Sequence, residues 1–440
     1  MNTVTSALEL YERKTPTSRR LFDEARELIP GGVSRATLAF QPYPFYSAAA
    51  SGAVVTDVDG NDYIDLVNNY TSLPHGHGHP ATTEAASAQL AISPAIGTAH
   101  TLEADFAREL RDRIPAAARL HFTTTGSEAV GFAVRMARVA TGRTRVLKFE
   151  GGFHGSHNEL YQDIAVSPIL DVGVAVPARP ASAGLEPTGT ITAVYNDPES
   201  VRAAFDRWRG EIAVVVLEPF LGNAALITAE RAFLDAIFEI AHADGALVLF
   251  DEVQSLRAGY NGAQGLWGYE PDLVALGKIM GGGHPLAAFG GRADLFEALE
   301  GPDPAVLQTG TFTATPIALA AGRAAMLELD RPAYDDLERR TERLRRGIRD
   351  AFRNEGVPVR VNGLGSMFNI SVVDEDVRTF RAFRAADTAL FSRLRLEMLN
   401  RGVLIMPRGT GCLSTAVNDS QIDQVLVATQ EGLSAVVGSL

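Results

Sequence analysis

A lysine and an aspartate stand at the ends of two short apolar runs that have the length of buried strands. Asp251 follows the run at residues 246–250, and Lys278 lies 27 residues later, just after the run at residues 273–276. A lysine amine can form a Schiff base with the aldehyde of pyridoxal 5′-phosphate (PLP), and a carboxylate can keep the pyridine nitrogen of that cofactor protonated. The pair is therefore compatible with a PLP site, and a surface acid with a surface lysine is the alternative.

Hydroxyl side chains and a glycine come directly before a segment of helical character that runs to residue 140. The helix would begin at Thr125, Gly126 and Ser127. Free backbone N–H groups, hydroxyl donors and the positive end of the helix dipole would therefore lie close together. Together these groups can bind a phosphate dianion. An ordinary helix N-cap, which serine and threonine also favour, is the alternative interpretation.

An aromatic residue between glycines follows the next expected strand, at residues 146–149. The glycines in residues 151–155 let the backbone approach a ligand, and Phe153 offers a ring face for stacking. His154 is a candidate only because it is adjacent to Phe153. A core phenylalanine in a glycine-rich turn and a structural histidine are the simpler interpretations.

A second group of hydroxyl side chains, at residues 308–316, precedes another expected helix. Thr311 lies within this group, and Pro316 is typical of the first turn of a helix. The group would form a second phosphate-binding edge, or it would only cap the helix.

Two arginines lie in loops where a carboxylate could be bound. Arg35 follows the glycine pair at residues 31–32, and Arg408 follows an apolar run at residues 403–406. A guanidinium group can bind a carboxylate through two parallel hydrogen bonds. Both side chains are therefore candidate substrate-binding groups, although most loop arginines are simply solvated.

Three histidines at alternate positions suggest a metal site at first sight. His75, His77 and His79 are separated by glycines, and no matching set of Cys, Asp or Glu ligands accompanies them. We therefore predict no metal site. The sequence also has no Gly-x-Gly-x-x-Gly segment that opens a strand–helix unit, which argues against a dinucleotide site.

The composition indicates a globular enzyme without a nucleic acid or membrane partner. The formal charge of −13 argues against a basic face for nucleic acid and against binding to anionic membranes. Cys412 is the only cysteine, which excludes an intrachain disulfide and favours a reducing compartment. Residues 1–17 lack the apolar core of a signal peptide, and no apolar run is long enough to cross a bilayer. We expect a cytoplasmic protein.

Short apolar runs alternate with helical segments through the middle of the chain, which predicts a mostly parallel sheet with helices on its faces. The strands expected there are residues 146–149, 190–194, 212–217 and 246–250, and the helices include residues 231–242 and 316–329. A helix at residues 18–29 and a hairpin at 54–65 are expected before this region. After it we expect helices at 334–355, at 387–400 and from residue 420, and a strand at 366–373.

The length of 440 residues exceeds what a single core usually supports, so more than one domain is expected. We predict a large central domain at residues 77–329. The N-terminal segment, residues 1–76, and the C-terminal residues 330–440 would together form a smaller α+β domain.

Six segments in one order resemble the class III (subgroup II) PLP-dependent aminotransferases of fold type I. The segments are residues 125–129, 152–155, 218–219, 250–253, 276–278 and 310–311. The resemblance covers nearly the whole chain and implies the α/β fold of these enzymes, with its mostly parallel central sheet. It also implies an enzyme that uses PLP, an amine or amino acid donor and a 2-keto acid acceptor.

The resemblance assigns roles to individual residues. Lys278 would be the Schiff-base lysine, and Asp251 would be the partner of the ring nitrogen. Val253 and Phe153 would lie on the two faces of the ring. Thr311 would reach the phosphate from the neighbouring subunit, which implies a homodimer with shared active sites. The remaining cofactor contacts would come from Thr125, Gly126, Ser127, His154 and Glu218.

Within the family, residues 30–34 and 278–283 look most like the glutamate-1-semialdehyde aminomutases. The aminomutases have a substrate-binding arginine where this chain has Leu38, and the arginine of this chain is Arg35 instead. This difference argues against aminomutase activity.

The substrate motifs look more like those of bacterial β-amino acid (β-phenylalanine) aminotransferases. Arg35 and Arg408 match two arginines that in those enzymes bind the carboxylates of the amino donor and the keto acid, and Tyr70 lies in a matching segment. Tyr70 would form a pocket wall together with Tyr43 and Phe45. Residues 164–189 match neither branch and would shape the pocket entrance.

The expected reaction is the transfer of an amino group from a β-amino acid or related amine to a 2-keto acid by a ping-pong mechanism. The amine of Lys278 would move the proton, acting as general base and then general acid. The alternatives are an aminomutase, a racemase or decarboxylase on the same scaffold, and a non-catalytic PLP-binding protein.

Overall fold

A seven-stranded sheet forms the centre of the computed structural model, which describes residues 6–38, 40–161 and 189–439. The strand order is β4-β12-β11-β10-β7-β5-β6, and β12 runs antiparallel to both of its neighbours. The other pairings are parallel, which confirms the predicted α/β fold with a mostly parallel sheet. The strands are β4 (Arg119–Thr123), β5 (Arg145–Phe149), β6 (Thr190–Ala193), β7 (Ile212–Leu217), β10 (Leu247–Asp251), β11 (Leu273–Leu276) and β12 (Ala287–Gly291).

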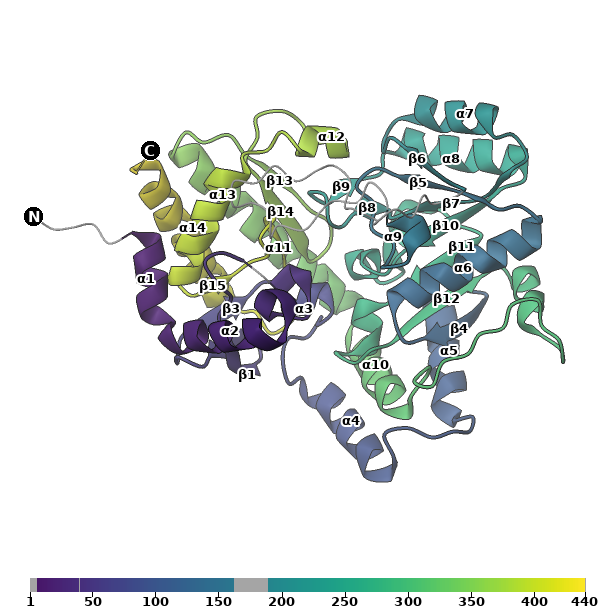
Figure 1. Cartoon of the computed structure of the whole chain (residues 1–440), viewed down its shortest axis with the longest axis horizontal. Coiled ribbons are helices and arrows are strands. Elements are labelled where there is room, and N and C mark those ends of the chain that lie inside the picture. Colours follow the sequence, from purple (N-terminus) through teal and green to yellow (C-terminus); the bar gives the residue numbers. More distant parts are fainter. Residues whose placement is uncertain (1–5, 39, 162–188, 440) are drawn as a thin grey trace, which may run out of the picture.

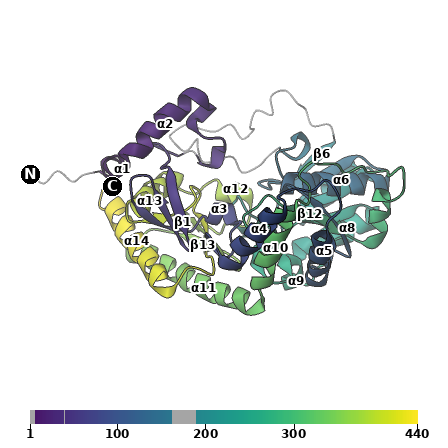
Figure 2. The same ribbon diagram turned by 90° about the horizontal axis from the view of Figure 1, so that it is seen from below.

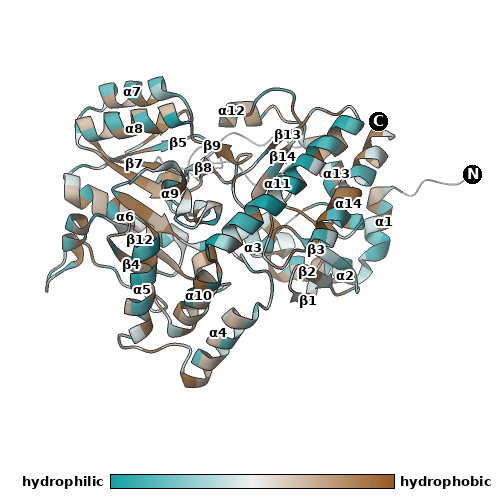
Figure 3. Cartoon of the chain, turned by 180° about the vertical axis from the view of Figure 1, so that it is seen from behind, coloured by the Kyte–Doolittle hydropathy of each residue, from teal (hydrophilic) through white to brown (hydrophobic). Residues whose placement is uncertain are grey.

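Helices cover both faces of this sheet, as Figure 1 shows. Alternate side chains of β7 point to opposite faces, so that Val214 and Val216 pack in one core cluster and Val215 and Leu217 in another. The helix α6 (Gly126–Thr141) covers the first cluster, and α7 (Pro198–Arg207) and α8 (Arg231–Asp244) cover the second. In Figure 3 the central strands are among the most hydrophobic parts of the chain, as expected for strands buried on both faces.

The two ends of the chain meet in a second, smaller sheet. The predicted hairpin forms β2 (Val54–Asp57) and β3 (Asp62–Asp65), and β1 (Ser47–Ser51) pairs with β2. The strand β15 (Val403–Leu404) runs parallel to β3, with Val403 opposite Ile64. A further sheet contains β13 (Arg360–Asn362), β14 (Met367–Ser371) and β16 (Thr410–Cys412). The smaller part of the fold is thus built from both chain ends, as predicted.

Long helices support these smaller sheets. The helix α1 (Ala7–Lys14) lies against α13 (Thr388–Asn400), and the Lys14 Nζ donates a hydrogen bond to the Asn400 carbonyl at 2.9 Å. The helix α14 (Asp419–Val437) packs on α13 and on α11 (Arg331–Asn354). Figure 2 shows α1 and α14 side by side at the end of the molecule far from α8. The domain limits at residues 76 and 329 stay predictions.

Several elements were not predicted from the sequence. They include the antiparallel strand β12 and the helix α4 (Pro80–Ile92), which packs against α10 (Pro316–Glu328). The other elements that were not predicted are α3 (Asn68–Thr71), α5 (Thr101–Arg113), α9 (Gly262–Trp267), α12 (Phe380–Phe383), β8 (Phe220–Leu221) and β9 (Ile227–Thr228). The helix predicted at residues 18–29 is confirmed as α2 (Pro16–Leu28). The segment 164–189, expected to shape the pocket entrance, lies outside the described residues except for Gly189. Among the helices that the structure describes, none has the length and apolar character to span a bilayer.

Candidate active site

A cavity of about 430 Å³ lies at the carboxyl ends of β10 and β11, beside the start of α6. Ligands of open α/β sheets bind at this edge, because the loops that leave the parallel strands meet there. Most of the predicted site residues line the cavity: Arg35, Thr125, Gly126, Ser127, Phe153, His154, Glu218, Asp251, Val253 and Lys278. In the described part of the single chain, Tyr70, Thr311 and Arg408 are not among the lining residues.

Lys278 lies two residues beyond the end of β11 and begins a short 3₁₀ turn, Lys278–Gly281. Its φ of 49° lies in the left-handed region, which non-glycine residues seldom adopt and which often marks functional sites. Burial lowers the pKa of the Lys278 amine, and the charges of Glu218 and Asp251 act in the opposite direction. A lowered pKa leaves more neutral amine, which suits a nucleophile and a general base.

Asp251 is the last residue of β10, and both of its carboxylate oxygens are engaged. Oδ1 accepts the N–H of Val253 at 3.1 Å, and Oδ2 lies 2.9 Å from Nδ1 of His154. Burial lowers the pKa of His154, so the ring is neutral and donates Nδ1–H to the carboxylate. His154 Nε2 is buried and has no hydrogen-bond partner within the described residues. The carboxylate is therefore fixed in orientation at the edge of the cavity.

Glu218 follows β7 and contacts two backbone segments. Its Oε1 accepts the N–H of Phe153 at 2.9 Å, and its Oε2 accepts the N–H of Gly222 at 3.1 Å. Burial and, less strongly, the charge of Asp251 raise the pKa of Glu218 to about 8. Glu218 therefore both lines the cavity and holds the loop that carries Phe153.

The start of α6 forms a cradle for an anion. Thr125 is the N-cap, and its Oγ1 accepts the N–H of Glu128 at 3.2 Å. The N–H groups at the first helical positions, Gly126 and Ser127, have no acceptor within a helix, as at every helix start. A Cβ at Gly126 would lie 2.9 Å from a methyl group of Val253, so only glycine lets Val253 approach the start of the helix this closely.

The residues of the cavity fit PLP. An amine and a carboxylate, Lys278 and Asp251, line the same cavity as the phosphate cradle at Gly126, so groups for the aldehyde, the ring nitrogen and the phosphate are all present. Phe153 and Val253 supply apolar surfaces beside them. These are the chemical groups by which proteins bind and activate PLP.

Arg35 provides a cation at the rim of this cavity. Its Nη1 donates to the side-chain oxygen of Asn69 at 3.1 Å, and its guanidinium lies 5.3 Å from the centre of the Tyr70 ring. The Tyr70 hydroxyl donates to the carbonyl of Thr37. Asn69 and Tyr70 therefore orient Arg35, although Tyr70 itself is not among the lining residues.

The other predicted substrate and phosphate contacts lie outside the cavity of the single chain. The Nη1 of Arg408 donates to the carbonyl of Asn223 at 3.3 Å, and Asn223 is a lining residue. Thr311 is exposed. Tyr43 packs on Tyr11 and Phe45 on Tyr63, so neither forms a wall of the cavity, contrary to expectation.

Sequence reasoning missed the unusual turn that carries Asn69 and Tyr70. Four successive residues, Asn68 to Thr71, have positive φ values between 46° and 71°. Such runs are rare because each L-residue in this conformation is unfavourable by roughly 1–2 kcal/mol. The Asn68-Asn69 pair was the available signal, since asparagine tolerates this conformation best after glycine. Asp65 holds the start of the turn by accepting the N–H groups of Val67 and Asn68.

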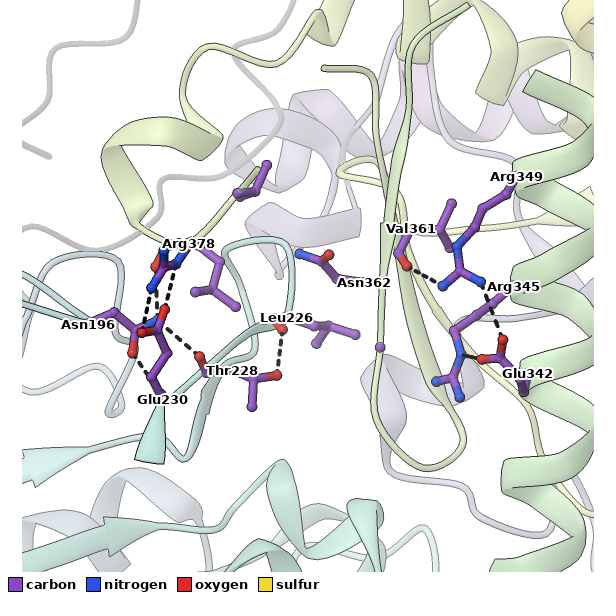
Figure 4. Close-up of a pocket in the computed structure, with 13 residues that line it drawn as sticks. Asn196, Leu226, Thr228, Glu230, Glu342, Arg345, Arg349, Val361, Asn362 and Arg378 are labelled. Carbon is purple, nitrogen blue, oxygen red and sulfur yellow. Dashed lines mark hydrogen bonds and ion pairs between the residues drawn. The ribbon is translucent and has the colours of Figure 1, made fainter. Parts of the chain in front are cut away.

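A second cavity, of about 370 Å³, lies where β9 approaches α11 and β13 (Figure 4). None of the predicted site residues lines it. Arg378 forms an ion pair with Glu230 at 2.6 Å, and Arg345 and Arg349 both form ion pairs with Glu342. Arg345 also pairs with Glu338, so each of these charged groups has a partner of opposite charge and the cavity lacks the residues of the reaction site.

The three histidines have structural partners. The Nε2 of His75 is 2.9 Å from the carbonyl of Ala325, and the ring of His79 stacks on that of His75. The Nε2 of His77 lies at hydrogen-bond distance, 2.7 Å, from Oδ2 of Asp65. In the described ranges, no cluster of His, Cys, Asp or Glu could hold a metal ion.

Comparison with known proteins identifies the family. The family model described as "Aminotransferase class-III" matches residues 39–432. The chain is 35% identical to a glutamate-1-semialdehyde 2,1-aminomutase 2 of Bacillus cereus (strain AH820) over 96% of this chain and 99% of that protein.

Solved structures agree with this assignment. An omega-transaminase from Sphaerobacter thermophilus has a TM-score of 0.90 and 35% identity, over 95% of this chain and 97% of that one. A beta-phenylalanine aminotransferase from Variovorax paradoxus has a TM-score of 0.91 and 32% identity, over 99% of this chain and 97% of that one. The chain therefore belongs to the class III aminotransferases, which use PLP as cofactor and amine and keto acid substrates.

Proposed function

We propose that this enzyme transfers an amino group from a β-amino acid or a related amine to a 2-keto acid by a ping-pong mechanism. The observation that carries the proposal is the position of Arg35, which lines the same cavity as Lys278 and Asp251 and is oriented by Asn69 and Tyr70. A guanidinium at this place offers a bidentate site for the carboxylate of an amino acid donor. The likeness to a beta-phenylalanine aminotransferase supports the β-amino acid as donor.

The chain's own residues divide the work of the reaction. PLP, when bound, supplies an aldehyde for the amino group and an electron-accepting ring. Asp251, oriented by His154, holds a proton on the pyridine nitrogen. Lys278 Nζ takes the proton from the donor carbon as general base and returns it as general acid. Its lowered pKa favours the first of these steps.

The remaining predicted contacts hold the cofactor in place. The N–H groups of Gly126 and Ser127 and the hydroxyl of Thr125 would bind the phosphate. Phe153 and Val253 would contact the two faces of the ring.

Thr311 would complete this phosphate site from a second subunit. It is exposed on the single chain, next to Phe312, which is 64% exposed. Leu307 in the same segment is 68% exposed, and two large exposed apolar side chains close to Thr311 in the sequence support burial of this segment in a homodimer. Sedimentation analysis would test this part of the proposal, because a monomeric holoenzyme would contradict it.

Two different substrates must use one pocket in a ping-pong reaction. Two arginines would supply one carboxylate-binding site for each substrate. Arg35 lines the cavity, and Arg408 is bound to the carbonyl of Asn223 at its rim. One arginine would bind the carboxylate of the donor and the other that of the keto acid.

The experiment is a half-reaction with the PLP-loaded protein and racemic 3-amino-3-phenylpropanoate, without a keto acid. The expected result is loss of the visible absorbance of bound PLP and gain of the pyridoxamine phosphate band. Lys278→Ala is the control and should show no such change. An unchanged spectrum in wild-type protein that holds PLP would contradict the β-amino acid as donor.

Glutamate-1-semialdehyde 2,1-aminomutase activity is the second candidate, because aminomutase relatives are 35% identical over nearly the full chain. An aminomutase keeps both half-reactions on one substrate and needs no external keto acid. Conversion of glutamate 1-semialdehyde to 5-aminolevulinate without a keto acid would favour it. Leu38, at the position of the aminomutase arginine, argues for the transaminase.

A further inference from the structure

Two buried side chains, an amine and a carboxyl group, bind the single peptide unit that joins Gly152 to Phe153. Lys148 Nζ donates to the Gly152 carbonyl at 3.1 Å, and Glu218 Oε1 accepts the Phe153 N–H at 2.9 Å. The C=O and N–H of a trans peptide point in opposite directions, so the two side chains approach this peptide from opposite sides. Lys148 lies in β5 and Glu218 follows the adjacent strand β7.

Both side chains are themselves held by further bonds. Lys148 Nζ also donates to the carbonyl of Leu160 at 2.9 Å, and the second oxygen of Glu218 accepts the N–H of Gly222. Burial of a polar group is costly unless the group is hydrogen-bonded, so the folded chain retains these bonds. The peptide is therefore bound at both ends by groups that have little freedom to move.

The need for such a restraint follows from the residues just before this peptide. Gly151 has a φ of 81°, and Gly152 follows it, so two successive residues without side chains precede Phe153. Glycine allows backbone rotations that other residues exclude. Without the two bonds, the plane of the Gly152–Phe153 peptide would rotate more freely, and the ring of Phe153 would lose its fixed position.

We propose that Lys148 and Glu218 are positioning residues that act together on the Gly152–Phe153 peptide and so fix the ring of Phe153 for stacking on the cofactor. This inference rests on the proposed role of Phe153 as a contact of the PLP ring. Glu218 then acts on the cofactor through the backbone. The rival account is a direct effect of the Glu218 carboxyl group on Lys278, Asp251 or the cofactor itself.

A double-mutant cycle on cofactor binding separates these accounts. The ligand is pyridoxamine 5′-phosphate, which cannot form a Schiff base with Lys278. Its dissociation constant from the cofactor-free protein therefore reports non-covalent contacts alone. Isothermal titration calorimetry would be applied to wild type, Phe153→Ala, Glu218→Met and Lys148→Met, and to each methionine variant combined with Phe153→Ala. Methionine keeps much of the side-chain length but provides neither the ammonium nor the carboxylate.

The expected result is that the losses of binding free energy in the single variants do not add up in the double variants. Phe153→Ala and each methionine variant should weaken binding by about tenfold, the size of a lost aromatic stacking contact. In the Phe153→Ala background, either methionine substitution should weaken binding by less than about twofold further, because the ring that it positions is gone. The circular dichroism of the bound ligand should change in the single variants as it does in Phe153→Ala.

Other outcomes would overturn the inference. If the fold loss of affinity in each double variant equals the product of the losses in its two single variants, Lys148 and Glu218 act independently of Phe153. Failure of wild type to bind pyridoxamine 5′-phosphate would overturn the proposed function, and this inference with it. Urea unfolding of the cofactor-free variants provides the folding control. If Lys148→Met does not fold, the cycles with Glu218→Met and with the milder Glu218→Gln decide the question.

Discussion

The imidazole Nδ1 of His154 lies 2.9 Å from Oδ2 of Asp251, and both side chains are buried at the end of β10. The neutral ring has one N–H to donate, and the carboxylate is the partner that it meets. This pair links the glycine-rich loop after β5 to the acid that would face the pyridine nitrogen. Removal of the histidine should therefore weaken cofactor binding more than it destabilises the fold.

His154→Leu should weaken PLP binding and lower kcat/KM by roughly 10- to 100-fold, since a hydrogen bond to a charged group contributes about 1.5–3 kcal/mol. Equilibrium dialysis of PLP and steady-state kinetics would measure the two effects. His242 forms a similar contact with Asp272 at 2.9 Å, but neither residue lines the cavity, so His242→Leu is the control. Wild-type affinity in His154→Leu would exclude the proposed orienting role.

Lys278→Ala should abolish turnover and still retain cofactor through the contacts at the start of α6. The amine is the only group assigned to move the proton, and its loss leaves Asp251 and the phosphate site in place. Absorbance after gel filtration would measure the retained cofactor, and a coupled transamination assay would measure turnover. Sustained turnover by this variant would refute the assignment of Lys278.

Arg35→Ala should raise KM for a carboxylate-bearing substrate by about 10- to 100-fold, the effect of losing a charged hydrogen-bond partner. A simple amine lacks the carboxylate, so its KM should stay nearly constant. The same pair of assays on Arg408→Ala should show which substrate carboxylate each arginine binds. Arg20→Ala is the control, because Arg20 is an exposed arginine on α2 that pairs with Glu24. Equal losses for amine and amino acid would contradict carboxylate binding.

The residues at strand ends were predictable from the sequence because their position follows from the fold class alone. Asp251 and Lys278 come at or just after apolar runs, and the carboxyl ends of neighbouring parallel strands meet at one edge of the sheet. The start of α6 was predictable for the same reason, since Thr125 and Gly126 come directly before a helical pattern. Local sequence therefore places the groups that line this edge of the cavity.

The elements that depend on distant partners were not predictable. The strand β12 is inserted antiparallel between β4 and β11, and no local pattern reveals its neighbours. The left-handed turn at Asn68–Thr71 persists because groups far along the chain hold it. Arg257, one of these groups, is fully buried, although arginine is usually exposed.

A pH effect on stability should arise from His75, which is buried between Ala325 and Thr415. Burial lowers the pKa of His75 to about 4, below the value of 6.5 expected in the unfolded chain. The unfolded state therefore binds the proton more readily, so stability is complete above pH 6.5 and falls as the pH decreases toward 4. The loss amounts to about 3 kcal/mol at most.

Urea unfolding of wild type and His75→Gln between pH 4 and 7 would measure this contribution. The variant should lose less stability than wild type over this interval, because glutamine does not titrate. Identical pH dependence in the two proteins would show that His75 is not the responsible group.

Arg257 should stabilise both the fold and the substrate side of the cavity. Its Nε donates to the Ser366 hydroxyl at 2.8 Å and its Nη1 to the Thr71 carbonyl at 3.0 Å, and its Nη2 donates to the carbonyl of Leu413. These bonds join the segment after β10 to the end of the left-handed turn and to the C-terminal part of the chain. Arg257→Met should lower the free energy of unfolding by about 1–3 kcal/mol for each buried acceptor left without a donor.

The same variant should also raise KM for the amino donor, because release of the Thr71 carbonyl loosens the turn that carries Asn69 and so the orientation of Arg35. Urea unfolding and steady-state kinetics with an amino acid and with a simple amine would measure both effects. Arg209→Met is the control, since Arg209 is exposed and pairs only with Asp206 on the surface of the described chain. Loss of stability with an unchanged KM for the amino acid would show that Arg257 supports the fold without orienting Arg35.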